Sequence, residues 1–522
     1  MSSNQRKSLV AAASLVAVAA ILSRILGYAR EVMLAAKFGA SNVTDAYLVA
    51  QEIPGAVYYV VSLSLVLAFI PIYRDVLQKQ GEAAAWRLVN IFLNVALIVF
   101  GVLWVIGEIG APLYLPLLAP GFSREAMVLT ISLTRAMLPM LLLVGVAGLS
   151  AAVLNAHQRF GPPAFFALAS NVVVVGALAV ASRPEHIHWI AYAVVGGTLL
   201  GVIIQVINLP RLGYRYRLTL DWGDAAHRHV WGLLIPVMIA TSVYQVQTLS
   251  ARFFASHLAE GAISLLNYAA RIGTLPFTVV GMAVTTVIYP VLAEQGAAGR
   301  FPDLRETLKG GIRTLSFILV PMAVGTAIFA EPITRLMFER GAFTPDDTQM
   351  TAYALQFIAL GMLFTGWVDV LNRTFYAIQD SFTPMWMAVV MIGINLVLNY
   401  FLVDILGLGG LALSSSLSPL IGSLLLLWRL GRRIGSVGDW SVGRALLSYI
   451  ATSILGGGAG WWLLRLGSTA MGESGLVQAA LLVVGLSLIL VVHIGAAILF
   501  RTPDGDEIRR MGARVMRKIR RA

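Results

Sequence analysis

The sequence lacks cysteine altogether and has few charged residues. Only 12% of its 522 residues are charged, about half the usual share for a soluble domain. Without cysteine, disulfides, thiolate nucleophiles and cysteine–metal sites are excluded. The seven histidines form no HExxH-like pair. A mean hydropathy of +0.80 further excludes an ordinary soluble enzyme and a disordered chain.

What the chain has instead is a series of long apolar runs. Runs of about 20 residues are typical of membrane-spanning helices, whereas the strands of a transmembrane β-barrel alternate. We therefore predict an all-α polytopic membrane protein with fourteen transmembrane helices. The predicted spans are Leu9–Lys37, Tyr47–Tyr73, Leu88–Ile109, Met127–His157, Pro163–Ser182, Trp189–Arg211, Val230–His257, Ala262–Glu294, Leu308–Phe338, Tyr353–Ile378, Thr383–Asp404, Gly409–Leu430, Ala445–Leu466 and Gly475–Phe500.

The first run resembles a signal peptide at its start, because Arg6 and Lys7 precede apolar residues. It continues past Ser23 and Arg24 to Lys37, which is too long for a signal core. We expect it to be the first span.

Basic residues are unevenly distributed among the loops. With a cytoplasmic N-terminus, the loops after even-numbered spans should be basic. They hold most of the loop arginines and lysines, and the tail from Arg501 to Ala522 is basic as well. We therefore predict that both termini are cytoplasmic and that the tail faces anionic lipid. Few basic residues lie in the opposite loops, such as Arg124, Arg183 and Arg340.

Spans 1–6 and 7–12 resemble two halves of a repeat. Pro54 and Pro276 lie at similar places in spans 2 and 8, and residues 155–163 and 375–384 both pass from a glutamine through a polar turn to a proline. Two six-span halves are a common transporter plan. We predict an N-terminal lobe at 1–220 and a C-terminal lobe at 221–440 in pseudo-two-fold arrangement. Two extra helices at 441–501 and a cytoplasmic tail at 502–522 follow.

Arginine dominates the charges at membrane depth. An arginine inside a span costs roughly 3 kcal/mol on insertion scales, so it needs a partner or a watery cavity. A cavity with excess positive charge suits an anion, and guanidinium forks match pyrophosphate oxygens. In the first eight spans, Arg24, Arg30, Arg135, Arg252 and Arg271 outnumber Glu31 and Glu52. Structural roles stay open: an ion pair between Arg24 and Glu31, pairing of Asp369 with Arg373, and interhelical support by Arg252 and Arg271.

A nine-residue motif in the first span carries a family resemblance. Residues Ser23–Glu31 read SRILGYARE, which resembles the SRxLGxxRD/E signature of the MurJ (MviN) family. These are the lipid II flippases of the multidrug/oligosaccharidyl-lipid/polysaccharide (MOP) exporter superfamily. Further matches follow in order at 38–40, 44–47, 68–72, 119–122, 154–165, 268–271, 341–344 and 375–384.

The resemblance implies a fourteen-span transporter of the bacterial cytoplasmic membrane. Its members move undecaprenyl-pyrophosphate-linked MurNAc-pentapeptide-GlcNAc to the outer leaflet while two lobes alternate between inward-open and outward-open states. Residues matching Arg24, Arg30 and Arg271 line the cavity and bind the pyrophosphate-sugar head. Asp45 matches an acidic position near the outer gate. The last two spans form a groove for the polyprenyl tail.

The chain departs from the family pattern in the second span. Tyr58 and Tyr59 stand where members commonly have basic residues, and residues 62–64 read Ser-Leu-Ser where a Glu-Gly-Ala is frequent. The acid expected before Arg271 is also absent. We expect Arg252 to restore a cation from another wall of the cavity, and the two tyrosines to stack on sugar.

The sequence thus predicts a lipid II flippase working by alternating access and functional as a monomer. Asp45, Glu31 and Glu52 are candidates for a gate or for coupling to Na⁺, H⁺ or Cl⁻, and no cofactor is expected. One alternative is a flippase for another polyprenyl-linked saccharide, such as an O-antigen or teichoic precursor. A drug/cation antiporter of the MATE type would need a net acidic cavity. An enzyme would need a catalytic cluster that the sequence lacks, and nucleic acid is not an expected partner.

Overall fold

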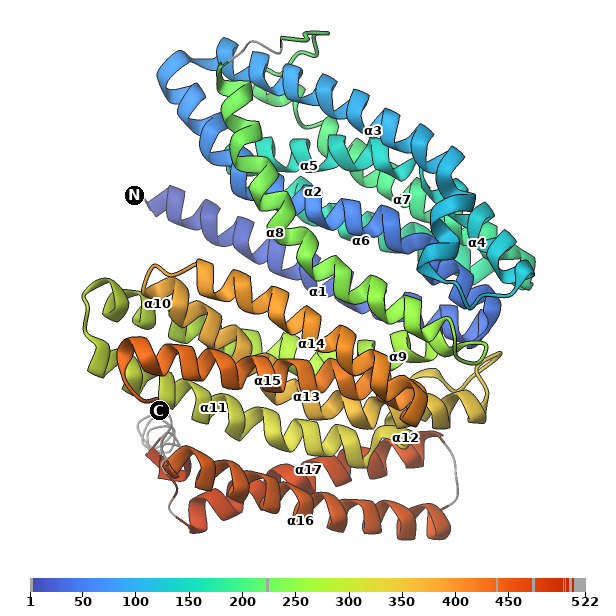
Figure 1. Cartoon of the computed structure of the whole chain (residues 1–522), viewed down its shortest axis with the longest axis vertical. Coiled ribbons are helices and arrows are strands. Elements are labelled where there is room, and N and C mark those ends of the chain that lie inside the picture. The colour runs from blue at the N-terminus through green and yellow to red at the C-terminus, as the bar shows by residue number, and fades with distance from the viewer. Residues whose placement is uncertain are drawn as a thin grey trace. The chain divides into compact units, whose positions relative to one another are not determined.

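The computed structural model describes residues 3–221, 225–437, 440–471 and 475–500, with 502, 504–506 and 509–510 of the tail. Within these ranges the chain forms helices joined by short loops and no strand (Figure 1). The predicted all-α fold is confirmed. The remaining tail, including residues 511–522, lies outside the described residues.

Two compact units divide the chain. The first comprises Met1–Ser264 and Arg340–Phe343, and the second comprises Leu265–Glu339 and Thr344–Ala522. The predicted boundary between lobes at residue 220 stays a prediction. Helices of the first unit are α1 (Ser3–Phe38), α2 (Asn42–Gln80), α3 (Glu82–Leu118), α4 (Arg124–Met137), α5 (Met140–Ala156), α6 (Gly161–Val180), α7 (Ile187–Val206) and α8 (Ala225–Ala255), with short turns η1 (Pro184–His186) and η2 (Pro210–Leu212).

The second unit holds the remaining helices. They are α9 (Ala262–Pro276, whose first three residues belong to the first unit), η3 (Phe277–Gly281), α10 (Met282–Ala297), α11 (Phe301–Ile328), α12 (Ala330–Phe338), α13 (Pro345–Ala377), α14 (Phe382–Leu406), α15 (Leu408–Ile434), α16 (Trp440–Met471) and α17 (Gly475–Leu499). Every predicted span lies on one of these helices or on consecutive ones, and several extend one or two residues past a helix end.

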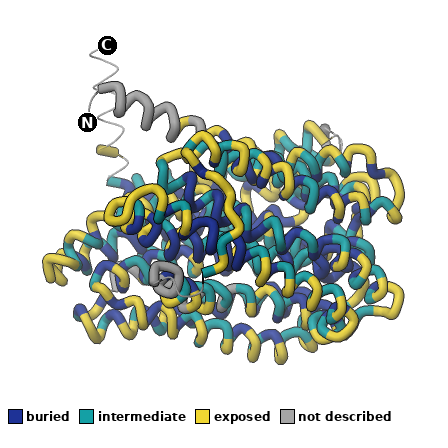
Figure 2. Tube along the Cα trace, turned by 90° about the horizontal axis from the view of Figure 1, so that it is seen from above, coloured by how far each residue is buried: buried dark blue, intermediate teal, exposed yellow. Residues whose placement is uncertain are grey.

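Ten helices in the described part of the chain are long and apolar enough to cross a membrane. The number rises to eleven when α4 and α5, bent by 41° at their junction, count as one span. Three further long helices, α1, α8 and α16, include residues whose side chains are not described. Figure 2 shows many exposed residues along the helices, as expected for surfaces that face lipid.

Proline accounts for two of the helix irregularities. Pro139 lies at the junction of α4 and α5, where it removes a backbone donor and disfavours a continuous helix. Pro276 ends α9 and is followed by the π-helical turn η3 before α10 continues the same predicted span. A π-turn absorbs the missing hydrogen bond without ending the span.

The predicted repeat has a matching backbone feature in each unit. Gln158 and Gln379 both adopt the left-handed conformation, with φ of 59° and 61°, which is uncommon for a residue other than glycine. The same hydrogen bond closes both turns, as in a Schellman motif: Arg159 N–H to Leu154 C=O at 2.8 Å, and Asp380 N–H to Phe375 C=O at 2.9 Å.

The turns at Gln158 and Gln379 also lie the same number of residues after the start of a helix. Ser123 caps α4 by accepting a hydrogen bond from Ala126 N–H, and Thr344 caps α13 through a capping box with Asp347. Ser123 precedes Gln158 by as many residues as Thr344 precedes Gln379. The bent α4–α5 pair and the continuous α13 therefore correspond, as the repeat predicts.

The second turn is fixed by an aspartate. Asp380 accepts hydrogen bonds from the Thr383 N–H at 2.9 Å and hydroxyl at 2.7 Å, and Arg433 lies 3.2 Å away. Burial alone would raise the pKa of Asp380, but these hydrogen bonds and the arginine charge together lower it below its ordinary value. The carboxylate therefore stays ionised and holds the start of α14 at neutral pH.

Helices α16 and α17 lie side by side in the second unit (Figure 1). His493 of α17 is 2% exposed. Its Nδ1 lies 2.9 Å from the Thr452 hydroxyl of α16, and its Nε2 lies 3.0 Å from the Phe317 carbonyl of α11. His493 thus links the two extra helices to the rest of the unit.

Small residues permit close helix crossings. A Cβ added to Gly197 of α7 would lie 2.8 Å from the Ser170 Cα of α6, whereas one added to the neighbouring Gly196 would meet nothing within 4 Å. Such small-residue contacts are a common basis of helix association in lipid.

We expect Gly197→Ala to lower the free energy of unfolding by about 1–3 kcal/mol, because the methyl group overpacks the α6–α7 crossing. Gly196→Ala, the matched control, should leave stability unchanged or raise it by about 0.5–1 kcal/mol, because alanine favours the helix. Thermal unfolding of the purified variants measures both effects. Equal midpoints for the two variants would contradict the contact.

Candidate functional site

The charged motif of the first span lies on a helix that continues through Gly27. Arg24 is exposed on α1, and Arg30 is half-buried. The Arg30 Nη2 atom lies 2.9 Å from the Glu31 Oε1 atom, and Glu31 is 4% exposed. Since α1 has no break at Gly27, Arg24 and Arg30 remain about 120° apart around the helix. Glu31 therefore forms its ion pair with Arg30. The sequence analysis had considered a pair between Glu31 and Arg24 instead.

A residue that the sequence analysis missed anchors this motif. The Asn171 amide of α6 donates hydrogen bonds to the Ser23 carbonyl at 3.1 Å and to the Ser23 hydroxyl at 3.3 Å. Asn171 therefore fixes the backbone beside Arg24. The available signal was a lone amide in the middle of the apolar run Pro163–Ser182.

Arg252 and Glu52 meet inside the first unit. The Arg252 Nε atom of α8 lies 3.4 Å from the Glu52 Oε2 atom of α2, and its Nη1 donates to the Ile263 carbonyl at 3.2 Å. Their side chains are only 11% and 14% exposed. The pair balances two charges that would each be costly to bury alone. Direct contact between Arg252 and a head group stays a prediction.

Asp45 contacts the backbone next to the residue that Arg252 contacts. It sits in the first turn of α2, is 3% exposed, and accepts a hydrogen bond from the Ser264 N–H at 2.7 Å. Ser264 lies in the first turn of α9, so the carboxylate meets the positive end of that helix dipole. Asp45 and Arg252 thus both bind the backbone of residues 263–264.

Four loop segments meet around the end of α1. The Ala342 N–H donates to the Ala36 carbonyl at 2.8 Å. Gly341 lies so close to Ala36 that any Cβ there would overlap the Ala36 carbonyl, and a Cβ on Gly261 would lie 2.5 Å from the Ala40 carbonyl. Gly121 approaches the Ser256 carbonyl in the same manner, and its N–H donates to the Ser256 hydroxyl at 3.2 Å. We call the segments 36–41, 120–121, 256–261 and 340–343 the loop cluster.

The two tyrosines of α2 differ in their surroundings. Tyr58 stacks on Phe166 of α6, with ring centroids 5.5 Å apart and planes within 7°, whereas Tyr59 is 46% exposed. Tyr58 therefore already has an aromatic partner on one face. Nearby, the buried Ser64 hydroxyl lies 3.4 Å from the Thr241 hydroxyl of α8.

Arg271 lies on α9 in the second unit and is exposed. On the same unit, Asp369 and Arg373 of α13 pair at 3.0 Å, as their spacing predicted. Among the residues described, no group of three or more histidines and acids is arranged to hold a metal ion.

The fold is similar to those of solved membrane transporters. A solved lipid II flippase MurJ in an inward closed conformation matches with a TM-score of 0.78 at 23% identity, covering 93% of this chain and 99% of that one. An inward-facing multidrug MATE transporter of the MOP superfamily matches with a TM-score of 0.67 at 13% identity, covering 80% and 95%.

Sequence comparison narrows the class to one family. The family model described as lipid II flippase MurJ matches residues 34–481. The lipid II flippase MurJ of Burkholderia cenocepacia is 30% identical over 91% of this chain and 94% of its own length. The probable lipid II flippase MurJ of Synechocystis is 27% identical over 100% and 99%. The chain therefore belongs to the lipid II flippase MurJ family, a family of transporters and not of enzymes, and is a multi-pass protein of the bacterial inner membrane.

The Arg252–Glu52 pair generates a prediction on stability. Arg252→Met alone should lower the free energy of unfolding by about 3 kcal/mol, because it leaves the Glu52 carboxylate buried without a counter-charge. The double variant Arg252→Met with Glu52→Gln should recover most of that loss, since no unpaired charge remains. Thermal unfolding of the two single variants and the double variant gives the coupling between the residues. Additive losses would mean that the two side chains do not interact.

Proposed function

We propose that the protein carries lipid II from the inner to the outer leaflet, with arginines holding its pyrophosphate-sugar head. The observation that carries this proposal is Arg24, which is exposed on α1 and has no ion-pair partner in the described part of the chain. The neighbouring Asn171 contacts fix the backbone that presents it. Arg30 and Arg271 supply further positive charge, and guanidinium groups bind phosphate oxygens bidentately.

Alternating access is the transport mechanism that we propose. In the predicted topology the loop cluster faces outward, because it follows odd-numbered spans. Its close backbone contacts would then close the outer end of the cavity, and the Asp45–Ser264 hydrogen bond would form part of that gate. Arg252 and Glu52 lie on α8 and α2, the helices that lead into this gate. They would be the charges that separate and pair again when the gate opens and closes.

The membrane potential is a sufficient driving force for the loaded step. Moving two negative charges outward across an inside-negative potential of about 100 mV releases about 4–5 kcal/mol. We propose that Asp45, Glu31 or Glu52 couples the return step to Na⁺, H⁺ or Cl⁻. The carrier acts as a monomer with both termini in the cytoplasm, and the polyprenyl tail lies along α16 and α17.

A second cargo is favoured by one observation. Tyr59 is 46% exposed, at a position where the family resemblance would predict a basic residue. An exposed aromatic ring suits sugar stacking, so another polyprenyl-linked saccharide is the alternative cargo.

We expect the protein to restore growth to bacteria depleted of their own lipid II flippase. Arg24→Ala, Arg30→Ala and Arg271→Ala should each reduce transport by roughly tenfold or more, because each removes a charge-assisted contact with the head group. Rescue at matched membrane levels is the measurement, with Arg183→Ala in an exposed loop as the control. Failure of the well-expressed, unaltered protein would favour the other saccharide cargo, whereas rescue by all three variants would refute the arginine site.

The absence of cysteine allows a direct test of alternating access. Ala36→Cys and Ala342→Cys introduce the only two thiols, on backbones joined by a hydrogen bond and therefore within disulfide reach. Oxidation should abolish rescue and reduction should restore it, because the disulfide holds the loop cluster together. Each single-cysteine variant is the control. A cross-linked protein that still transports would show that the loop cluster does not open.

A further inference from the structure

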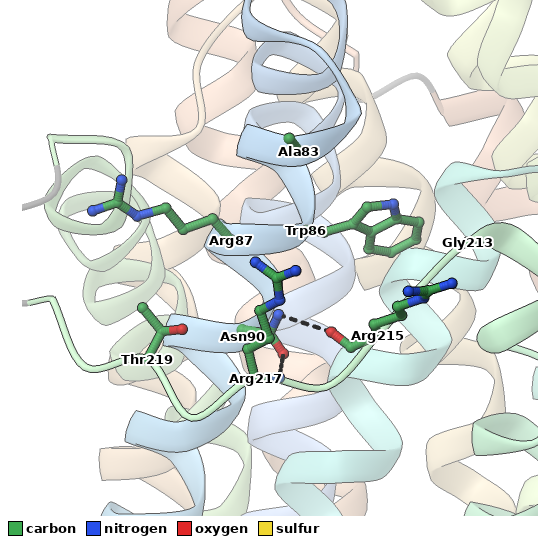
Figure 3. A pocket seen from close by; sticks show the side chains of 8 residues that line it. All are labelled: Ala83, Trp86, Arg87, Asn90, Gly213, Arg215, Arg217 and Thr219. Atoms are coloured by element: carbon green, nitrogen blue, oxygen red, sulfur yellow. Dashed lines mark hydrogen bonds between the residues drawn. The ribbon is translucent and has the colours of Figure 1, made fainter.

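A basic pocket lies outside the proposed transport site. It has a volume of about 400 Å³ and is formed by the first turns of α3 and by the loop at 213–219 (Figure 3). Trp86, Arg87 and Asn90 line it from the helix, and Arg215, Arg217 and Thr219 line it from the loop. Figure 3 shows the guanidinium groups of Arg215 and Arg217 directed toward the end of α3 that carries Trp86.

Two buried asparagines of α3 hold the loop in an extended form. The Asn90 side chain donates to the Arg215 carbonyl at 3.2 Å and accepts from the Arg217 N–H at 3.0 Å. The Asn94 amide donates to the Arg217 carbonyl at 3.2 Å and the Thr219 carbonyl at 3.0 Å. Both asparagines are 3% exposed. The positions of the loop arginines are therefore built into the fold.

The charges of the pocket are only partly neutralised. Arg87 pairs with Asp221 at 2.5 Å. No acidic residue in the described ranges forms an ion pair with Arg215 or Arg217, and both are exposed. The Trp86 ring is held in place by stacking on His157, at 5.6 Å between centroids. The pocket thus offers two available guanidinium groups beside a fixed aromatic wall.

The same loop presents apolar side chains between its arginines. Tyr216, Leu218 and Leu220 alternate with Arg215, Arg217 and Thr219 and are 54%, 78% and 47% exposed. An extended backbone directs alternate side chains to opposite sides. One side of the loop therefore carries positive charge, and the other carries Leu218 and Leu220, which are costly to leave in water but favourable in lipid. The Tyr216 hydroxyl instead donates to the Asn94 side-chain oxygen of α3 at 2.8 Å.

We propose that this pocket binds the phosphate of an anionic membrane lipid, with Arg215 and Arg217 on the head group and Leu218 and Leu220 against the acyl chains. In the predicted topology the loop and the start of α3 are cytoplasmic, where anionic head groups attract clustered arginines. The loop joins α7 to α8, so a bound lipid would hold the segment before α8 at the membrane surface. This site is separate from the transported lipid and stands whether or not the proposed cargo is correct.

The test uses the full-length protein in detergent, with phosphatidylglycerol as the probe and native mass spectrometry as the measurement. Arg215→Ser with Arg217→Ser should weaken phosphatidylglycerol binding by roughly tenfold or more, because two phosphate contacts are lost. The matched control, Arg159→Ser with Arg211→Ser, removes the same charge from exposed residues outside the pocket and should weaken binding by less than about threefold. Thermal unfolding of both double variants checks that each is folded.

Three results would overturn the proposal. Equal losses in the two double variants would mean that overall charge, and not the pocket, attracts the lipid. Unchanged binding after loss of Arg215 and Arg217 would remove the site altogether. Displacement of phosphatidylglycerol by millimolar inorganic phosphate would identify a free phosphate ion as the ligand in place of a lipid. Retained binding in the control, lost binding in the pocket variant and insensitivity to phosphate together support it.

Discussion

The cost of placing a charge among apolar helices constrains this molecule more than any other interaction. Lipid offers no water to a guanidinium or carboxylate, so each charge within a span needs a partner or a watery cavity. Arg252 and Glu52 satisfy this requirement across two helices, and Arg373 and Asp369 satisfy it along one. Arg24 is exposed and has no such pair among the residues described, and this contrast separates a candidate ligand contact from structural pairs.

Polar groups also decide how the helices of the first unit are held together. Asn171 fixes the backbone beside Arg24, Asp45 fixes the start of α9, and Asn90 and Asn94 fix the loop before α8. In each case a side chain that is buried, or half-buried for Asn171, satisfies backbone groups of a distant segment. Such contacts are directional, whereas the surrounding apolar packing is not, so they specify which segments meet.

The sequence predicted the features that depend on residues close together in the chain. Apolar runs located the helices, the four-residue spacing predicted the Asp369–Arg373 pair, and the glutamine-containing segments indicated corresponding turns. The sequence could not predict the partners of Arg252, Asp45 and Asn171. Each partner lies far from its residue along the chain, and no sequence periodicity indicates which residues meet. The continuity of α1 through Gly27 was also undetermined, since glycine permits a bend without requiring one.

The left-handed turns at Gln158 and Gln379 bear on the origin of the chain. A left-handed backbone costs about 1 kcal/mol or more for a residue other than glycine, so two unrelated segments have little physical reason to adopt it with the same side chain. Here both do, each closing the same hydrogen bond after the same interval from its helix cap. Duplication of one ancestral half-length gene accounts for this agreement.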